Sequence, residues 1–235
     1  MNKSQLDIVI PVYNEGEKIT KLIKLIEKKL TIKFKIFICY DSEEDTTLKF
    51  IKKNKKKIIF VKNPGRGPNT AIIHGISKTN ANIVVVYMAD DFKNIDLINL
   101  MYQEITSGYD LIIPSRFIKD GKFIGEKFFK KSVATIGYLI LFYLVGIPFR
   151  DCTNAFKMFN RKIIKKIKLE SKFGFTYALE MTIKAYFMNF NIKELPYVWI
   201  YNDYRKSNFK IFKWIPYYLY WVIYGFKKKI LNLIN

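Results

Sequence analysis

The chain has 235 residues, enough for one α/β domain or two small ones, and half of them are hydrophobic, which supports a sizeable core. Its 41 Lys and Arg residues against 20 Asp and Glu give a formal net charge of +21, which favours polyanionic partners such as nucleic acid, anionic lipid or phosphorylated substrates. One histidine and two unrelated cysteines exclude a zinc site built from those ligands, and no signal peptide is expected.

The first half of the chain alternates between strand-like and helix-like runs. Short apolar runs predict strands at 6–12, 36–40, 58–61, 83–88 and 111–113. The intervening patterns predict helices at 15–30, about 45–53, 69–77 and roughly 94–106. This alternation predicts an α/β fold with a doubly wound, mostly parallel sheet whose strand ends share one edge.

The second half contains two long apolar stretches. Residues 132–149 carry no charge, but Gly137, Gly146 and Pro148 interrupt them, and a bilayer crossing needs about 20 apolar residues. An interfacial or buried helix is therefore preferred over a membrane span. Residues 209–226 interleave aromatic residues with lysines, a pattern typical of the bilayer interface. A pair of core helices with solvated ends is the alternative.

Polar residues follow the predicted strands where an α/β sheet binds ligands. Asp90 and Asp91 end the strand at 83–88, and such a pair suits Mg²⁺ shared with phosphate oxygens. The alternative is a helix cap formed by Asp90. Asn14 follows the first strand and is predicted to cap the next helix, while Asp41 and the Arg66 loop follow the second and third strands.

Three motifs, in this order, resemble the family 2 glycosyltransferases: residues 9–15, 41–47 and 89–91. Residues 67–75, 114–117, 151–157 and the region of Glu180 are similar to the branch of dolichol-phosphate mannosyltransferases and polyprenyl-phosphate glycosyltransferases. The resemblance implies a GT-A fold, with a mixed, doubly wound sheet flanked by helices. Together with the two apolar stretches, it leads us to expect a catalytic domain at 1–205, with a membrane-facing helix at about 127–149, and aromatic, basic interface helices at 206–235.

The resemblance also implies roles for individual residues. Those expected to bind the donor nucleotide are Pro11, Tyr13, Asn14, Glu15, Asp41, Arg66 and Asp90. Asp91 is the expected metal ligand, and Asp90 is expected to contact ribose or metal. Two positions depart from the family pattern, because Ala89 replaces its first acid and Tyr40 replaces the acid that usually precedes Asp41.

For the acceptor side, the resemblance implies phosphate contacts from Arg116, Lys131 and Ser132. Arg116 joins Asp90 and Asp91 as an expected catalytic residue. Arg205 and Ser207 resemble a mobile loop that closes over the donor, with an ordinary basic surface loop as the alternative. Glu180 is a candidate base for a hydroxyl acceptor or, equally, a satisfied buried carboxylate.

The resemblance implies transfer of a sugar from a GDP- or UDP-sugar to a polyprenyl phosphate, with inversion and with Mg²⁺ or Mn²⁺. The alternative is a family 2 glycosyltransferase that uses a saccharide or other hydroxyl acceptor in cell-envelope glycan synthesis. The expected location is the cytoplasmic face of a membrane, in contact with lipid and with a membrane protein as a further candidate partner. Nucleic acid is not an expected partner, since no RRM, KH or helix-turn-helix pattern appears.

Overall fold

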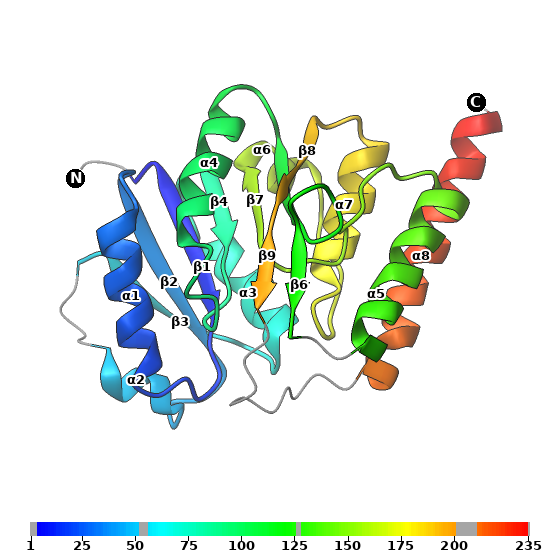
Figure 1. Cartoon of the computed structure of the whole chain (residues 1–235). Coiled ribbons are helices and arrows are strands. Elements are labelled where there is room, and N and C mark those ends of the chain that lie inside the picture. Colours follow the sequence, from blue (N-terminus) through cyan, green and yellow to red (C-terminus); the bar gives the residue numbers. More distant parts are fainter. Residues whose placement is uncertain (1–3, 52–55, 126–127, 201–210, 235) are drawn as a thin grey trace.

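The computed structural model describes residues 4–51, 56–125, 128–200 and 211–234. Helices cover both faces of a seven-stranded sheet with strand order β3-β2-β1-β4-β7-β5-β8, and β6 pairs with β9 in a second, small sheet (Figure 1). The strands are β1 Leu6–Pro11, β2 Phe34–Tyr40, β3 Ile58–Lys62, β4 Ile83–Val86, β5 Leu111–Ser115, β6 Lys122–Ile124, β7 Lys157–Asn160, β8 Ile192–Pro196 and β9 Val198–Ile200. This architecture confirms the predicted doubly wound mixed sheet.

The large sheet is parallel except at one strand. β7 runs antiparallel to both of its neighbours, β4 and β5. The carboxyl ends of the other six strands therefore meet at one edge, and β7 begins at that same edge. The segment before β7 thereby reaches the edge where α/β sheets bind ligands.

The helices bury their apolar stripes on the sheet. They are α1 Lys18–Lys29, α2 Thr46–Phe50, α3 Pro68–Lys78, α4 Ile95–Thr106, α5 Phe128–Ile140, α6 Arg161–Lys166, α7 Tyr177–Phe187 and α8 Ile211–Ile234. In α1 the residues at helical spacing, Ile19, Leu22, Ile23 and Ile26, are all buried. α1 and α4 cover one face, and α3, α6 and α7 cover the other.

The second half forms a helix pair at one end of the sheet. α5 continues into a π-helical segment, η1 Leu141–Val145, which ends at Gly146 in the left-handed conformation. α8 lies beside α5 (Figure 1) and packs on η1 and α7 through the buried Trp221. None of the helices in the described ranges combines the length and apolar character that a membrane crossing requires. The division into 1–205 and 206–235 stays a prediction.

Several predicted boundaries were wrong by a few residues. The first helix begins at Lys18 rather than at residue 15, because Asn14 and Gly16 both adopt positive φ, which is incompatible with a helix. The fourth strand ends at Val86 rather than at residue 88, because its pairing with β1 ends where Val86 lies opposite Val9. The helix predicted at about 127–149 ends earlier, at Gly146.

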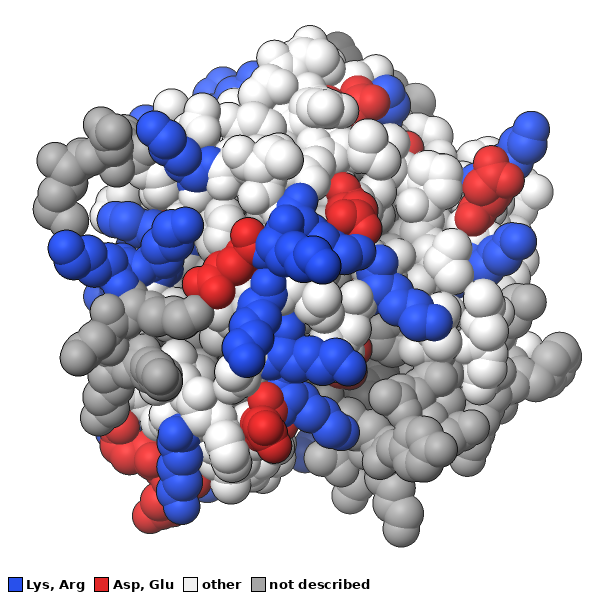
Figure 2. Space-filling view, turned by 60° about the vertical axis from the view of Figure 1, so that its left-hand side comes forward, with Lys and Arg blue, Asp and Glu red and all other residues white. Residues whose placement is uncertain are grey.

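Basic side chains predominate among the charged groups on the side of the molecule that carries α1 (Figure 2). Lys18, Lys21, Lys24 and Lys28 of α1 are exposed there. Their spacing places them opposite the buried stripe of the same helix. An amphipathic surface helix has this distribution whether or not it binds a polyanion.

The close approach of α3 to the sheet depends on Gly75. A Cβ at this position would clash with Cys39 Sγ and lie 2.8 Å from Val9 Cγ1. We expect Gly75→Ala to lower the free energy of unfolding by about 1–3 kcal/mol through overpacking, as measured by urea denaturation. Gly137→Ala is the matched helical control, because a Cβ there meets nothing within 4 Å. Equal stability of the two variants would contradict this packing.

Candidate active site

The predicted donor residues lie in loops at the carboxyl edge of the sheet. After β1, the backbone N–H of Asn14 donates to both carboxylate oxygens of Asp45 at 3.1 Å, and Glu15 N–H donates to Thr47 Oγ1 at 3.0 Å. The Asn14 side chain accepts from Thr46 N–H at 3.1 Å. Asn14 therefore braces the start of α2 rather than capping α1, which corrects its predicted cap role.

These contacts fix the backbone that carries the remaining residues of the first loop. Pro11 ends β1, and the side chain of Tyr13 is 62% exposed. Asp45 also accepts from Thr47 N–H at 2.8 Å and thereby caps α2. The loop is thus held by Asp45 and Thr47, while the Tyr13 side chain is exposed to solvent.

Asp41 holds the glycine-rich loop that follows β3. Its carboxylate accepts from Asn63 Nδ2 and from the backbone N–H of Gly67, both at 2.7 Å. Asn63 also accepts from Gly65 N–H at 3.1 Å, so the loop is bound at several points. Arg66 lies at the exposed tip of this loop. The structure therefore brings Asp41 and Arg66 into one substructure, in which Asp41 is a loop brace.

The two acids after β4 have different surroundings. Asp90 is exposed, whereas Asp91 is buried with 5% exposure. The Asp91 carboxylate accepts from Lys93 N–H at 3.2 Å, Asn94 N–H at 3.1 Å, Asn94 Nδ2 at 2.9 Å and Tyr197 Oη at 2.9 Å. The cap-like contacts predicted as an alternative for Asp90 are therefore made by Asp91.

Burial, followed by the Asp91 charge, raises the pKa of Tyr197 well above its ordinary value, so this phenol stays protonated and donates. The same causes, burial first, raise the pKa of Tyr87, whose hydroxyl donates to the backbone carbonyl of Asp91 at 2.7 Å. Two phenols thus fix Asp91 and with it the position of Asp90. Sequence reasoning missed both tyrosines, because neither lies within the acid motif.

The residues after β4 fit a divalent ion only if phosphate oxygens of the substrate supply some of its ligands. In the described ranges, no group of three or more His, Cys, Asp and Glu residues converges on a common point. Mg²⁺ needs as few as one or two carboxylates when phosphate oxygens supply other ligands. Asp90 presents an exposed carboxylate for that arrangement. Asp91 as a metal ligand stays a prediction, alongside its hydrogen bonds.

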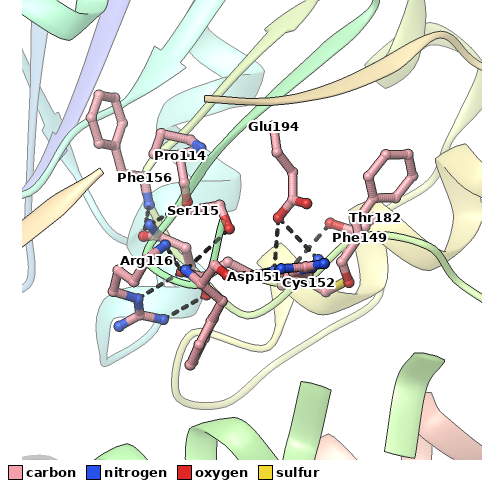
Figure 3. Close-up of polar contacts among 12 residues, drawn as sticks. Pro114, Ser115, Arg116, Phe149, Asp151, Cys152, Phe156, Thr182 and Glu194 are labelled. Carbon is pink, nitrogen blue, oxygen red and sulfur yellow. Dashed lines mark hydrogen bonds and ion pairs between the residues drawn. The ribbon is translucent and has the colours of Figure 1, made fainter. Parts of the chain in front are cut away.

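Arg116 follows β5 and forms a bidentate ion pair with Asp151 (Figure 3). Its Nε and Nη2 each lie 2.6 Å from a carboxylate oxygen, and its backbone N–H donates to the same carboxylate at 3.0 Å. The Asp151 side chain is fully buried, whereas that of Arg116 is 17% exposed. The guanidinium also lies over the Phe123 ring, 4.4 Å from its centroid.

Asp151 is in turn fixed from β8. Glu194 accepts from the backbone N–H groups of Arg150 and Asp151, both at 3.0 Å. Sequence reasoning placed Asp151 in a motif without giving it a role, and it missed Glu194. An alternating polar residue in the short strand β8 is a weak signal, because an exposed strand face has the same pattern.

The other predicted acceptor residues lie in or near α5. Ser132 is half-buried within α5, and Lys131 belongs to the same helix, with its side chain outside the described part. Phe117, next to Arg116, stacks on Tyr138 of α5 with ring centroids 6.0 Å apart. This contact links the Arg116 loop to the helix pair. Arg205 and Ser207 lie outside the described residues.

Glu180 is a buried, hydrogen-bonded carboxylate, which was the alternative to its predicted role as a base. Its carboxylate is fully buried and accepts from Glu170 N–H at 2.7 Å, Ser171 N–H at 2.8 Å and Lys184 Nζ at 2.7 Å. All of these donors belong to the protein itself. Glu180 therefore anchors the segment before α7.

Comparisons with known proteins agree with this geometry. The model described as "Glycosyl transferase family 2" matches residues 7–168. The chain is 23% identical over 201 residues to a dolichol-phosphate mannosyltransferase of Pyrococcus furiosus, covering 82% of this chain and 56% of that protein. It is 27% identical over 171 residues to an uncharacterized glycosyltransferase of Synechocystis, covering 70% of this chain and 52% of the relative. The chain thus spans about half the length of these curated relatives.

Among solved structures, glucosyl-3-phosphoglycerate synthase from Mycobacterium tuberculosis has a similar fold. That structure, in complex with Mn²⁺, UDP and phosphoglyceric acid, superposes with a TM-score of 0.69 and 13% sequence identity over 96% of this chain and 78% of that chain. The likeness confirms the predicted GT-A fold. Because the family model covers more than half of the sequence, the chain belongs to glycosyl transferase family 2.

Proposed function

We propose that the chain transfers a sugar from a nucleoside-diphosphate sugar to a polyprenyl phosphate at a membrane surface, with inversion and with a divalent metal ion. One observation carries this proposal. Arg116, whose side chain is partly exposed, lies at the carboxyl edge of the sheet. The neighbouring Phe117 stacks on Tyr138 and so connects Arg116 to a helix pair with an exposed apolar face. An anionic head group and an apolar tail would each have a complementary surface there.

The donor would bind along the loops after β1 to β4. Tyr13 offers an exposed ring for a base, and Asp41 holds the loop that carries Arg66. Asp90 presents its carboxylate where the diphosphate would lie. A divalent ion held there supplies Lewis-acid stabilisation of the negative charge that develops on the leaving diphosphate. The basic residue Arg66 would add electrostatic stabilisation at the same end.

A phosphate acceptor simplifies the chemistry of the other substrate. A phosphate oxygen is already anionic at neutral pH and needs little deprotonation before attack. This agrees with the saturated hydrogen bonding of Glu180, the carboxylate considered as a base. Arg116 would orient the phosphate, because a guanidinium binds phosphate oxygens through parallel N–H groups.

The helix pair supports a membrane surface as the location. Large apolar residues exposed on it recur at helical spacing: Ile136, Leu139, Tyr143 and Leu144 on α5 and η1, and Ile215, Leu219, Tyr220, Ile223 and Ile230 on α8. Exposed Lys213 precedes this stripe on α8, and Lys227–Lys229 interrupt its later part. Aromatic and aliphatic residues flanked by lysines suit the interface of a bilayer that contains anionic lipid. The cytoplasmic face is the side we propose.

Turnover with defined substrates tests the reaction. We expect the chain, incubated with a panel of UDP- and GDP-sugars, Mg²⁺ or Mn²⁺ and a short polyprenyl phosphate, to form a lipid-linked sugar with at least one donor. The product would be detected by mass spectrometry. Transfer to a soluble hydroxyl acceptor, with no lipid-linked product from any donor, would instead establish the alternative family 2 activity.

Substitutions of the two acids after β4 should have different effects, one on turnover and the other on stability. We expect Asp90→Asn to lower metal-dependent turnover by about a hundredfold or more, because a charge at the diphosphate is lost, with unfolding unchanged. Asp91→Asn should lower the free energy of unfolding by about 1–3 kcal/mol, because buried donors lose an acceptor. Initial rates and urea denaturation measure the two effects. Full turnover in Asp90→Asn would remove Asp90 from the site.

Membrane binding is tested on the exposed helix face. We expect Leu144→Glu in η1 to weaken binding to vesicles of phosphatidylcholine and phosphatidylglycerol by about tenfold, since burial of a leucine in lipid is lost. Leu100→Glu in α4 is the matched control, because the two leucines are 53% and 54% exposed. Flotation of the vesicles measures binding, and equal loss in both variants would count against this face.

A further inference from the structure

Lys157 is a fully buried lysine at the start of β7, where it pairs with Val86 of β4. Within the part of the chain that the structure describes, its Nζ has no hydrogen-bond partner. Burying an ammonium without hydrogen bonds costs stability, and native structures retain few such groups. Departures of this kind are concentrated at functional sites. Neither the donor nor the acceptor contacts described above use this residue.

The charged groups around Lys157 belong to the acceptor side of the site. Those that act on it are Arg116 after β5, Asp151 and Cys152 before β7, and Glu194 of β8. Burial raises the pKa of the Cys152 thiol to about 12, so Cys152 is neutral at physiological pH. Two carboxylates and two cations therefore interact electrostatically in this region, and Figure 3 shows Asp151 with Arg116 on one side and Glu194 on the other.

The ion pair of Arg116 limits its use as an anion-binding group. Both Nε and Nη2 are engaged by Asp151. If the guanidinium turned toward a phosphate, the buried Asp151 carboxylate would lose its charged partner, and an unpaired buried charge is strongly destabilising. A second buried cation in the same region would reduce that penalty, and the Lys157 ammonium, buried and without a hydrogen-bond partner, interacts electrostatically with Asp151.

We propose that Lys157 is a positioning residue whose buried positive charge offsets the Asp151 carboxylate without contacting it and so leaves the Arg116 guanidinium able to bind an anionic head group. The inference rests on the proposed acceptor site. It assigns Lys157 no contact with the substrate. Its effect is exerted through the electrostatic balance around Asp151.

This role makes anion binding depend on pH. Burial lowers the pKa of Lys157 to about 8, against the opposing effects of Cys152, Asp151 and Glu194, with Arg116 lowering it further. The ammonium is therefore charged at neutral pH and loses its charge above about 8. Because the unfolded chain holds that proton up to 10.5, the folded protein should gain stability as the pH rises from about 8 to 10.5.

Lys157→Met tests the inference, because it removes the charge with little change in volume. We expect the dissociation constant for farnesyl phosphate, measured by calorimetry at pH 7, to rise by about tenfold. The melting temperature should stay the same or rise, since a buried ammonium without hydrogen-bond partners has been removed. A purely structural role predicts a lower melting temperature instead. Binding of UDP should be unchanged.

Lys193→Met is the matched control. Lys193 lies on β8, and its ammonium pairs with Glu104 at 2.8 Å rather than acting on Asp151, so this variant should bind farnesyl phosphate normally. Unchanged affinity in Lys157→Met, or no binding to the unaltered chain, would overturn the inference. If Lys157→Met does not fold, the pH dependence of farnesyl phosphate binding to the unaltered chain still tests the inference. Its affinity should fall across about pH 7 to 9, and a flat profile would overturn the proposal.

The same measurements separate this inference from the proposed reaction. Lys157-dependent binding of farnesyl phosphate without sugar transfer from any donor would contradict the reaction and leave the role of Lys157 intact. Transfer to a polyprenyl phosphate that is unaffected by Lys157→Met would support the proposed reaction and contradict the role of Lys157.

Discussion

The ion pair of the buried Asp151 carboxylate with Arg116 is the interaction on which the proposed acceptor side of the molecule depends. It holds Arg116 at the end of β5, while the backbone of Asp151 is held by Glu194 of β8. The same segment connects η1 to β7. Three elements that are distant in sequence are thereby fixed relative to one another. This is achieved because β7 runs antiparallel between β4 and β5, which starts it at the edge where the other strands end.

Carboxylates act as braces at the opposite end of the site as well. Asp45 holds the loop after β1, Asp41 holds the glycine loop, and Asp91 holds the start of α4. Each accepts backbone N–H groups that a loop would otherwise leave unsatisfied. The acids of the sequence motifs are therefore of two kinds. Some are hydrogen-bonded to loop backbone and fix the loops at the carboxyl edge of the sheet, and others are exposed at that edge. At the end of β4 this division falls between adjacent residues, Asp91 and Asp90.

Local patterns predicted the first half of the fold well, because a buried parallel strand and an amphipathic helix have distinct periodicities. They did not predict β7, since a four-residue strand that begins with a lysine has no periodic signal and its direction depends on distant partners. The same limit applied to the site. Asp41, Asp90 and Arg116 follow strands and could be nominated from the sequence, whereas the tertiary contacts of Tyr197 and Glu194 and the burial of Lys157 have no local signal. The assignment of Asn14 as a cap of α1 was wrong, because the nearest N–H groups in space belong to α2.

The position of the helix pair bears on what kind of acceptor the site suits. Arg116 lies where the sheet ends, Phe117 stacks on Tyr138, and the exposed stripe of α5 and η1 continues from there to the outer surface. Lys229 of α8 donates to the carbonyl of Leu144 and so fixes α8 against η1. A small, fully polar acceptor would use Arg116 and leave this stripe exposed to water at a cost in apolar hydration. An amphiphile with an anionic head would satisfy both surfaces together, with its tail against the stripe.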